Sequence, residues 1–318
     1  MSNGDTGDGN PSTNERREAA RAKAKALRVQ HKKKDRARRY LLRGGLIIGS
    51  LAVITVVALV LINTVRPAGP GPLNMLSDGI KISQGLKAVP TGALAAEAEP
   101  VPSESDVETG VIDIQVYMDY YCALCDAFGE TNDEQIESWL DRGAATIEVH
   151  PISILNPNSM GTQYSTRSAN TAACVANYSP DTFWAVNKAL FANQPEERTA
   201  GLSDDELVAI VTEAGVLRET TIENCIRDQR FKNWVQEATL RALDGTVPGT
   251  DVVVEGAPTI VVNGLKYEGA VDDASAFAAF VVQAAGAAFT ESSTATPTPA
   301  PTTTAPAPTA TPTPTRAP

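Results

Sequence analysis

The sequence predicts an α/β domain with a helical insertion, preceded by one transmembrane helix. Three observations lead to this prediction. Two cysteines, Cys122 and Cys125, follow an apolar strand-like run at 111–117 and open a helical segment. A long block with helical spacing then precedes two further strand patterns and a last helix. An uncharged apolar run, residues 44–65, stands before all of these elements.

The N-terminal part has the pattern of a membrane anchor. About 20 apolar residues suffice to cross a bilayer, and the run 44–65 has 22 uncharged residues. Residues 1–43 hold 13 Lys/Arg against 5 Asp/Glu, whereas the rest of the chain holds 14 against 33. Basic flanks stay in the cytoplasm, so we expect 1–43 to be cytoplasmic and everything after 65 to be extracytoplasmic. A cleaved signal peptide is the alternative, which the long charged flank disfavours.

The basic segment 1–43 also raises the possibility of nucleic-acid binding. Aromatic residues are almost absent from it, and the apolar run follows at once. The remainder of the chain has a net charge of −19, which repels nucleic acid and favours solubility. We therefore expect no nucleic-acid partner and a membrane contact through residues 44–65.

Two segments have the composition of unfolded chain. Residues 66–108 are rich in Pro, Gly, Ala and Glu, which predicts a linker, with a short hairpin between 79–82 and 86–89 packed on the main domain. From residue 290 nearly all positions are Thr, Pro, Ala or Ser. Such a sequence cannot bury a core, so residues 288–318 are predicted to be a disordered tail.

Residues 109–287 remain for one core. The order of elements is a β-α-β unit, a helical block at about 156–243, a hairpin and a last helix. This order describes a thioredoxin-like fold with a helical insertion. The predicted elements are strand 111–117, helix 122–140, strand 145–150, helices within 161–243, strands 259–262 and 265–268, and helix 273–286.

Local signals place several of these boundaries. Ser179 before Pro180 is an N-cap followed by proline at the first helical position. Ser203 and Glu206 form a capping box before an apolar helical stripe. Asn263-Gly264 between two apolar runs predicts a two-residue hairpin turn.

The spacing of Cys122 and Cys125 predicts redox chemistry. Two cysteines three positions apart at a helix start can form and break a disulfide with little backbone motion. The free N–H groups and dipole of the helix N-terminus favour a negative sulfur at Cys122. A stabilised thiolate is a better leaving group and a more populated nucleophile, which is what thiol–disulfide exchange requires.

The chain has four cysteines, which allow three pairings. The simplest assignment is a redox pair, Cys122–Cys125, and a structural disulfide, Cys174–Cys225, both permitted outside the cytoplasm. A zinc site is disfavoured because zinc usually takes two closely spaced ligand pairs, and no second short pair is present. We expect no metal and no cofactor. An inert structural bridge at Cys122–Cys125 remains the other interpretation.

Two motifs resemble those of a known family. The stretch Tyr117-Met-Asp-Tyr-Tyr-Cys-Ala-Leu-Cys-Asp-Ala-Phe128 resembles the D-x-x-C-P-x-C-x-x-F motif of DsbA-like thiol–disulfide oxidoreductases. Gly256-Ala-Pro-Thr-Ile-Val-Val-Asn-Gly264 resembles their G-T-P-T-x-x-V-N-G motif. The resemblance covers residues 109–287. The anchor and the Thr/Pro-rich tail are similar to those of membrane-tethered members from actinobacteria.

The resemblance implies a role for each matched residue. Cys122 would be the nucleophile that forms the mixed disulfide, and Cys125 the resolving cysteine. Pro258 would be a cis-proline facing the two sulfurs, with Ala257 and Thr259 beside it as substrate-binding residues. A cis X-Pro bond exposes the preceding backbone, so Ala257 could pair with an extended substrate peptide. An ordinary trans proline opening an edge strand is the alternative for Pro258.

The sequence also departs from the family pattern. Ala123 stands where the family often has proline, and Leu124 is not the histidine of the strongest oxidants, which puts a very oxidising potential in doubt. Thioredoxin-like proteins often bury an acid six residues before the first cysteine, where this chain has Val116. Asp113, Gln115 and Asp119 are the nearby polar residues that could replace it. His150, at the end of the strand 145–150, is expected at the rim of the site and is assigned no role.

These features predict an extracytoplasmic thiol–disulfide oxidoreductase tethered to the membrane. It would exchange its Cys122–Cys125 disulfide with exported proteins, acting as an oxidase, and a membrane redox partner would recycle it. The same chemistry run backwards gives a reductase or isomerase. A non-catalytic peptide-binding surface module is the rival from another class.

Overall fold

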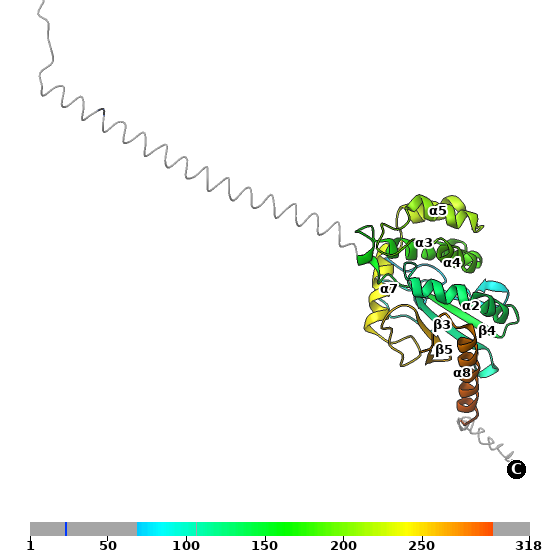
Figure 1. The fold of residues 1–318 in the computed structure, drawn as a ribbon. Coiled ribbons are helices and arrows are strands. Elements are labelled where there is room, and N and C mark those ends of the chain that lie inside the picture. Colours follow the sequence, from blue (N-terminus) through cyan, green and yellow to red (C-terminus); the bar gives the residue numbers. More distant parts are fainter. Residues whose placement is uncertain (1–22, 24–68, 106, 295–318) are drawn as a thin grey trace, which may run out of the picture. The chain divides into compact units, whose positions relative to one another are not determined.

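The computed structural model describes residues 23, 69–105 and 107–294 of the chain (Figure 1). The predicted cytoplasmic segment 1–43, apart from residue 23, and the predicted membrane helix 44–65 lie outside this part. Residues 295–318 of the predicted tail do so as well. Within the described residues, no helix is both long enough and apolar enough to span a bilayer.

A six-stranded mixed sheet forms the centre of the domain, in the order β2-β1-β4-β3-β5-β6. The central strands β3 and β4 run parallel, joined by the helix between them, and every other neighbouring pair is antiparallel. Because β3 and β4 are parallel, their carboxyl ends lie at the same end of the sheet. The strands are β1 (Ile80–Ser83), β2 (Lys87–Ala88), β3 (Ile112–Met118), β4 (Ala145–Pro151), β5 (Thr259–Val262) and β6 (Leu265–Lys266).

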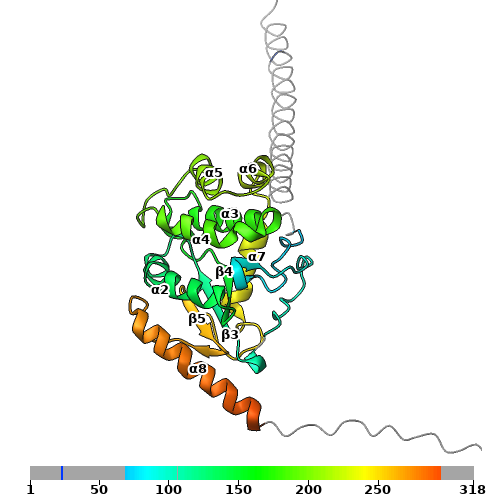
Figure 2. The same ribbon diagram turned by 90° about the vertical axis from the view of Figure 1, so that its right-hand side faces the viewer.

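The helical block lies between β4 and β5 in sequence, as the pattern predicted. Figure 2 shows α3, α4, α5 and α6 together at one end of the domain and α8 at the other end. The predicted capping box at Ser203 and Glu206 is present at the start of α5. The helices are α2 (Ala123–Asp141), α3 (Tyr164–Tyr178), α4 (Phe183–Ala192), α5 (Asp204–Glu213), α6 (Glu219–Arg227), α7 (Lys232–Asp244) and α8 (Ala274–Thr294).

The segment predicted as a linker, 66–108, is largely part of the folded domain. The hairpin within it forms β1 and β2, and β1 adds to the sheet beside β4. Met75, Ile80 and Ile82 are fully buried. The linker prediction was wrong for this part, because composition alone does not reveal that a few apolar residues fill the hydrophobic core at the edge of the sheet.

Helix α8 is longer than predicted. The sequence analysis ends this helix at residue 286 and starts the tail at 288, whereas α8 continues to Thr294. Ala287 and Ala288 favour continuation of the helix past Gly286, since alanine has the highest helix propensity.

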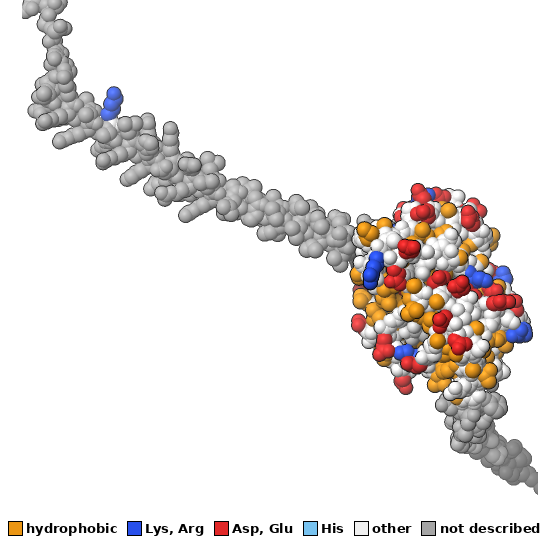
Figure 3. All heavy atoms as spheres, in the orientation of Figure 1, with side chains coloured by type: hydrophobic (Ala, Val, Ile, Leu, Met, Phe, Trp, Pro, Cys, Tyr) orange, Lys and Arg blue, Asp and Glu red, His pale blue; other side chains and the backbone are white. Residues whose placement is uncertain are grey.

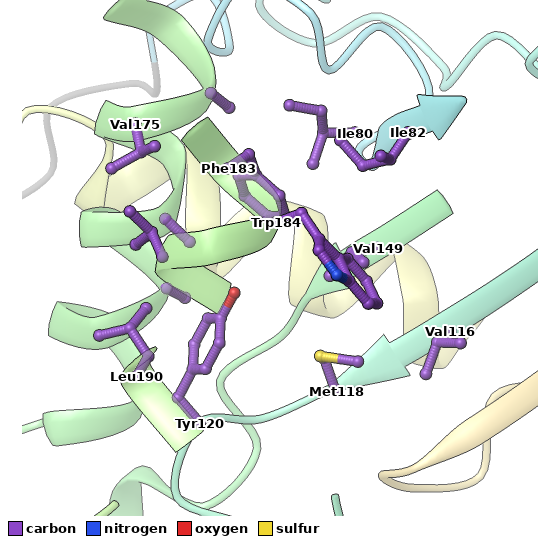
Figure 4. Packing of buried hydrophobic residues seen from close by; sticks show 14 of the residues in the cluster. Ile80, Ile82, Val116, Met118, Tyr120, Val149, Val175, Phe183, Trp184 and Leu190 are labelled. Atoms are coloured by element: carbon purple, nitrogen blue, oxygen red, sulfur yellow. The ribbon is translucent and has the colours of Figure 1, made fainter. Parts of the chain in front are cut away.

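The main core fills the space between one face of the sheet and the surrounding helices. Side chains from β1, β3 and β4 meet Phe183, Trp184 and Leu190 of α4 there (Figure 4). On the α2 side, Phe128 packs edge-to-face on Phe277 of α8, with 5.2 Å between ring centroids. This packing fixes α2 over the sheet and so fixes the two cysteines at its start.

A half-buried carboxyl on α2 gives a testable pH dependence. Burial raises the pKa of Asp133 to about 7, against a smaller opposing effect of Lys188. Because the folded-state pKa lies above the unfolded one, the protonated form favours folding, and that stability is lost as pH rises through 7. Asp133→Asn should therefore match the wild type near pH 4 and be more stable by about 2 kcal/mol at pH 8, after allowance for partial exposure.

Urea unfolding of the full-length chain in detergent, followed by tryptophan fluorescence, measures this difference. Glu134→Gln is the matched control, because Glu134 is an exposed acid on the same helix. A difference between Asp133→Asn and wild type that stays constant from pH 4 to 8 would contradict the prediction.

Candidate active site

The two cysteines of the C-x-x-C motif lie at the start of α2. Cys122 is the N-cap residue, and its sulfur accepts a hydrogen bond from the N–H of Cys125 at 3.2 Å. Cys122 is 5% exposed and Cys125 is 1% exposed. Both are free thiols in this structure. The strand–turn–helix context predicted from sequence is therefore present, with Cys122 the less buried of the two sulfurs.

The site shifts the pKa values of the two cysteine thiols in opposite directions. A hydrogen bond from the Cys125 thiol lowers the pKa of the Cys122 thiol, and the N–H groups of Cys125 and Leu124 lower it further against the opposing effect of burial. Burial, followed by the interaction with Cys122, raises the pKa of Cys125 well above its usual value. Cys122 is thus the sulfur that loses its proton more readily, and Cys125 is the one that holds its proton more tightly.

The loop before β5 completes the site from a distant part of the sequence. The Ala257–Pro258 peptide bond is cis. The Cys122 thiol donates a hydrogen bond to the Ala257 carbonyl at 3.3 Å. Thr259 is buried, and its hydroxyl donates to the Gly256 carbonyl at 2.8 Å. The structure therefore brings Ala257 and Pro258 to Cys122, whereas the Thr259 side chain faces into its own loop.

Asp119 is a buried acid beside the cysteines. It is fully buried, and its two carboxylate oxygens accept hydrogen bonds from the N–H groups of Tyr121 and Leu155, each at 2.9 Å. Burial raises the pKa of Asp119 to about 6 against these hydrogen bonds. Its negative charge also acts to raise the pKa of both cysteines. Asp119 therefore ties the turn before Cys122 to the segment that follows β4.

The helical insertion holds the cysteine turn through residues that the sequence analysis did not identify. The Gln194 side chain donates to the carbonyls of Tyr120 and Cys122, at 3.1 and 3.2 Å. A carboxylate oxygen of Glu197 accepts from the N–H of Ala123 at 3.2 Å. These contacts join positions more than 70 residues apart in the chain, and no local sequence pattern marks them.

The N-terminus of α2 stabilises the Cys122 thiolate. The Glu197 carboxylate lies at the same helix end, so its negative charge opposes a negative charge on Cys122. Removing this charge in Glu197→Gln should lower the Cys122 pKa by a few tenths of a unit, since charges at helix ends contribute about 0.3–1 kcal/mol. The same free energy should shift the equilibrium with glutathione about two- to fivefold toward the reduced form. The pH dependence of Cys122 alkylation, followed by mass spectrometry, measures the pKa.

Glu196→Gln is the matched control for Glu197→Gln. Glu196 is exposed like its neighbour, but only its backbone carbonyl contacts the site, through the Tyr121 hydroxyl. Equal changes in the Cys122 pKa for both variants would attribute the effect to general surface charge and contradict a specific role of Glu197.

The other two cysteines form the predicted disulfide. Cys174 of α3 is bonded to Cys225 of α6, with 5.9 Å between their Cα atoms, and both are buried. Among the described residues, no group of three or more His, Cys, Asp or Glu side chains is placed to hold a metal ion.

Comparison with known proteins identifies the family. Residues 111–281 match the family model described as thioredoxin, which is more than half of the chain. The chain belongs to this thioredoxin family. The predicted thioredoxin-like fold is confirmed, with a helical block inserted between β4 and β5. Family membership and the cysteine site together define a thiol–disulfide oxidoreductase.

Several solved structures are similar to this chain. Reduced DsbA from Mycobacterium tuberculosis is 22% identical with a TM-score of 0.48, over 68% of this chain and 99% of that one. Oxidised BdbD from Bacillus subtilis is 14% identical with a TM-score of 0.49, over 70% and 100%. MdbA, a thiol-disulfide oxidoreductase from Corynebacterium diphtheriae, is 16% identical with a TM-score of 0.45, over 69% and 94%. No curated protein matches the chain.

Proposed function

We propose that the protein is an oxidase that acts outside the cytoplasm, tethered to the membrane through residues 44–65. The lowered pKa of Cys122 at the N-terminus of α2 is the observation that carries the direction of the reaction. A stabilised thiolate stabilises the reduced enzyme, so the Cys122–Cys125 disulfide tends to take electrons from a substrate dithiol.

The proposed reaction is a pair of sulfur exchanges. A substrate thiolate attacks the Cys122 sulfur and breaks the Cys122–Cys125 bond, and Cys125 leaves and takes up a proton. A second substrate thiolate then attacks the substrate sulfur of the mixed disulfide, and Cys122 leaves as a thiolate. The substrate gains a disulfide, and two electrons pass to the enzyme. A membrane redox partner with an oxidised disulfide or quinone group then removes those two electrons.

The charge pattern and the second disulfide support the compartment. The net charge changes from positive before the apolar run to strongly negative after it. Acidic side chains are prominent on the face of the domain seen in Figure 3, where basic ones are few. The Cys174–Cys225 disulfide suits an oxidising environment outside the cytoplasm.

A redox titration tests the proposed direction. The full-length chain is equilibrated across a series of glutathione potentials, and differential alkylation with mass spectrometry reads each cysteine. An oxidase requires Cys122 and Cys125 to titrate together at an oxidising potential. A pair that stays oxidised until a strongly reducing potential would favour the reductase or the inert bridge and would overturn the oxidase.

A protease experiment tests the proposed compartment. Cells whose wall has been removed are treated with a protease, and antibodies detect the domain and the N-terminal segment separately. We expect the domain to be degraded while residues 1–43 are protected. Protection of both parts until the cells are lysed would place the domain inside.

A further inference from the structure

One side chain of the helical insertion bridges the turn that presents Cys122. The side-chain nitrogen of Gln194 donates hydrogen bonds to the carbonyl oxygens of Tyr120 and Cys122, at 3.1 and 3.2 Å. An amide nitrogen carries two hydrogens, so it can serve both carbonyls at once. One of these carbonyls stands before Tyr121 and the other follows Cys122. A single planar group therefore fixes the direction of the peptide units at both ends of this short segment.

Gln194 is itself held in place by the helix that precedes it. Its backbone N–H donates to the carbonyl of Phe191, near the end of α4, at 2.8 Å. Gln194 is half-buried, and Pro195 after it restricts its backbone. The same helix contacts the turn through Tyr120, whose hydroxyl donates to Asn187 at 2.9 Å. The bridge therefore joins the cysteine turn to the end of a packed helix.

The polar contacts of the Cys122 sulfur depend on the position of this turn. The sulfur accepts from the N–H of Cys125 at 3.2 Å and donates to the carbonyl of Ala257 at 3.3 Å. The Cys122 carbonyl also accepts a helical hydrogen bond from the N–H of Asp126 at 3.2 Å. A change in the backbone torsions of Cys122 would therefore turn its side chain relative to the N–H groups at the start of α2.

The reduced and oxidised forms of the site use this placement unequally. A thiolate on Cys122 gains more from an N–H donor than a neutral sulfur does, because charge-assisted hydrogen bonds are roughly twice as strong as neutral ones. A sulfur in the Cys122–Cys125 disulfide carries no charge, and its position is set by the covalent bond. A group that holds Cys122 at the end of α2 therefore stabilises the thiolate more than the disulfide.

We propose that Gln194 is a positioning residue for thiol–disulfide exchange, which holds Cys122 where the start of α2 stabilises its thiolate. Gln194 acts through the backbone carbonyls of the turn rather than on the reacting sulfur. Through this side chain, the helical insertion adjusts the redox equilibrium of a cysteine pair that lies outside it. The proposal holds for an oxidase and for a reductase alike.

Gln194→Met tests the proposal, because it removes both donor hydrogens and keeps the length of the side chain. The pKa of the Cys122 thiol should rise by about 0.4–1, and the equilibrium with glutathione should shift about two- to tenfold toward the disulfide, as expected for the loss of one hydrogen bond. Both are measured on the full-length chain in detergent. The pH dependence of Cys122 alkylation gives the pKa, and mass spectrometry after equilibration in glutathione buffers gives the redox equilibrium.

Two further variants separate positioning from a general structural role. Gln194→Asn keeps the amide on a shorter side chain that should reach only one carbonyl, so both values should lie between those of wild type and Gln194→Met. Asn193→Ala is the matched control, because the Asn193 side chain donates to the Ala189 carbonyl within α4, at 2.9 Å, rather than to the cysteine turn. It should leave the Cys122 pKa and the glutathione equilibrium unchanged, even if urea unfolding shows a loss of stability.

Wild-type values in Gln194→Met for both the Cys122 pKa and the glutathione equilibrium would overturn the proposal. Equal shifts in Asn193→Ala would also overturn it, because they would attribute the effect to loosening of α4. If Gln194→Met does not fold, Gln194→Asn decides the question by the same two measurements. A wild-type pair that does not titrate with glutathione at all would instead contradict the exchange reaction itself, so the two failures are distinguishable.

Discussion

Cys122→Ser is expected to reduce the oxidation of a reduced exported protein to the uncatalysed rate. Cys125→Ser is expected to lack this activity as well, because it cannot form the Cys122–Cys125 disulfide, but its Cys122 thiolate should attack a substrate disulfide, release one half as a thiolate and stay joined to the other half as a mixed disulfide. The asymmetry follows from the site, because the Cys125 thiol and the N–H groups at the α2 N-terminus lower the pKa of Cys122, and burial raises that of Cys125. Only Cys122 is therefore both attacked by a substrate and able to leave as a stable thiolate.

Non-reducing electrophoresis with mass spectrometry distinguishes the two variants. Each is incubated with a substrate protein in its disulfide form, and the covalent adducts are mapped. The double variant Cys122→Ser/Cys125→Ser is the control, and it should form no adduct if the Cys174–Cys225 disulfide takes no part. A wild-type rate in Cys122→Ser, or an adduct mapped to Cys125, would refute the assignment of the nucleophile.

The sequence was most informative where the signal is local. A strand, a C-x-x-C pair and a helix adjoin one another, so their mutual placement follows from backbone geometry alone. The same is true of the capping box at Ser203 and Glu206, which begins α5 in the structure. The pairing of Cys174 with Cys225 was also correct, because it was the pairing left once the short motif was assigned.

Sequence reasoning was weaker where contacts join distant segments. The approach of Ala257 to Cys122 was anticipated only through the resemblance to a family, since 135 residues separate them. Gln194 and Glu197 were missed for the same reason: polar loop residues carry no periodicity that reveals their partners. The hairpin of β1 and β2 was expected to pack on the main domain, yet its pairing with β4 as part of the sheet was not foreseen, because a Pro- and Ala-rich flank resembles a linker.

Polar residues inside the domain were the hardest to predict. Asp119 was one of several nearby groups that might replace the buried acid, and only the fold shows that its carboxylate is enclosed and bonded to two backbone N–H groups. His150 was expected at a rim, yet it lies between Tyr117 and Gly79. Whether a polar side chain at a strand end is exposed depends on what covers that face, and the segments that do so lie far away in sequence.

Removing the second disulfide is expected to lower stability while sparing the exchange chemistry. In Cys174→Ala/Cys225→Ala, the free energy of unfolding should fall by about 4 kcal/mol in the chain-entropy model, because the bond closes a loop of 51 residues. Both positions are changed together so that no lone thiol remains to react with the active-site pair. The bond joins α3 to α6, so its loss should loosen α6 before the sheet.

Urea unfolding of the full-length variant measures the stability loss, and the rate of Cys122 alkylation on the folded variant reports the active site. That rate should remain at the wild-type value, because α2 is held by the sheet and α8 rather than by α6. Each alanine also removes a buried sulfur and its packing contacts. Wild type treated with a reductant loses the bond but keeps both sulfurs, so it separates the stability lost with the bond from the stability lost with the packing. A loss below about 1 kcal/mol would mean that the insertion is held by its apolar contacts and that the disulfide contributes little, contrary to the loop-closure argument.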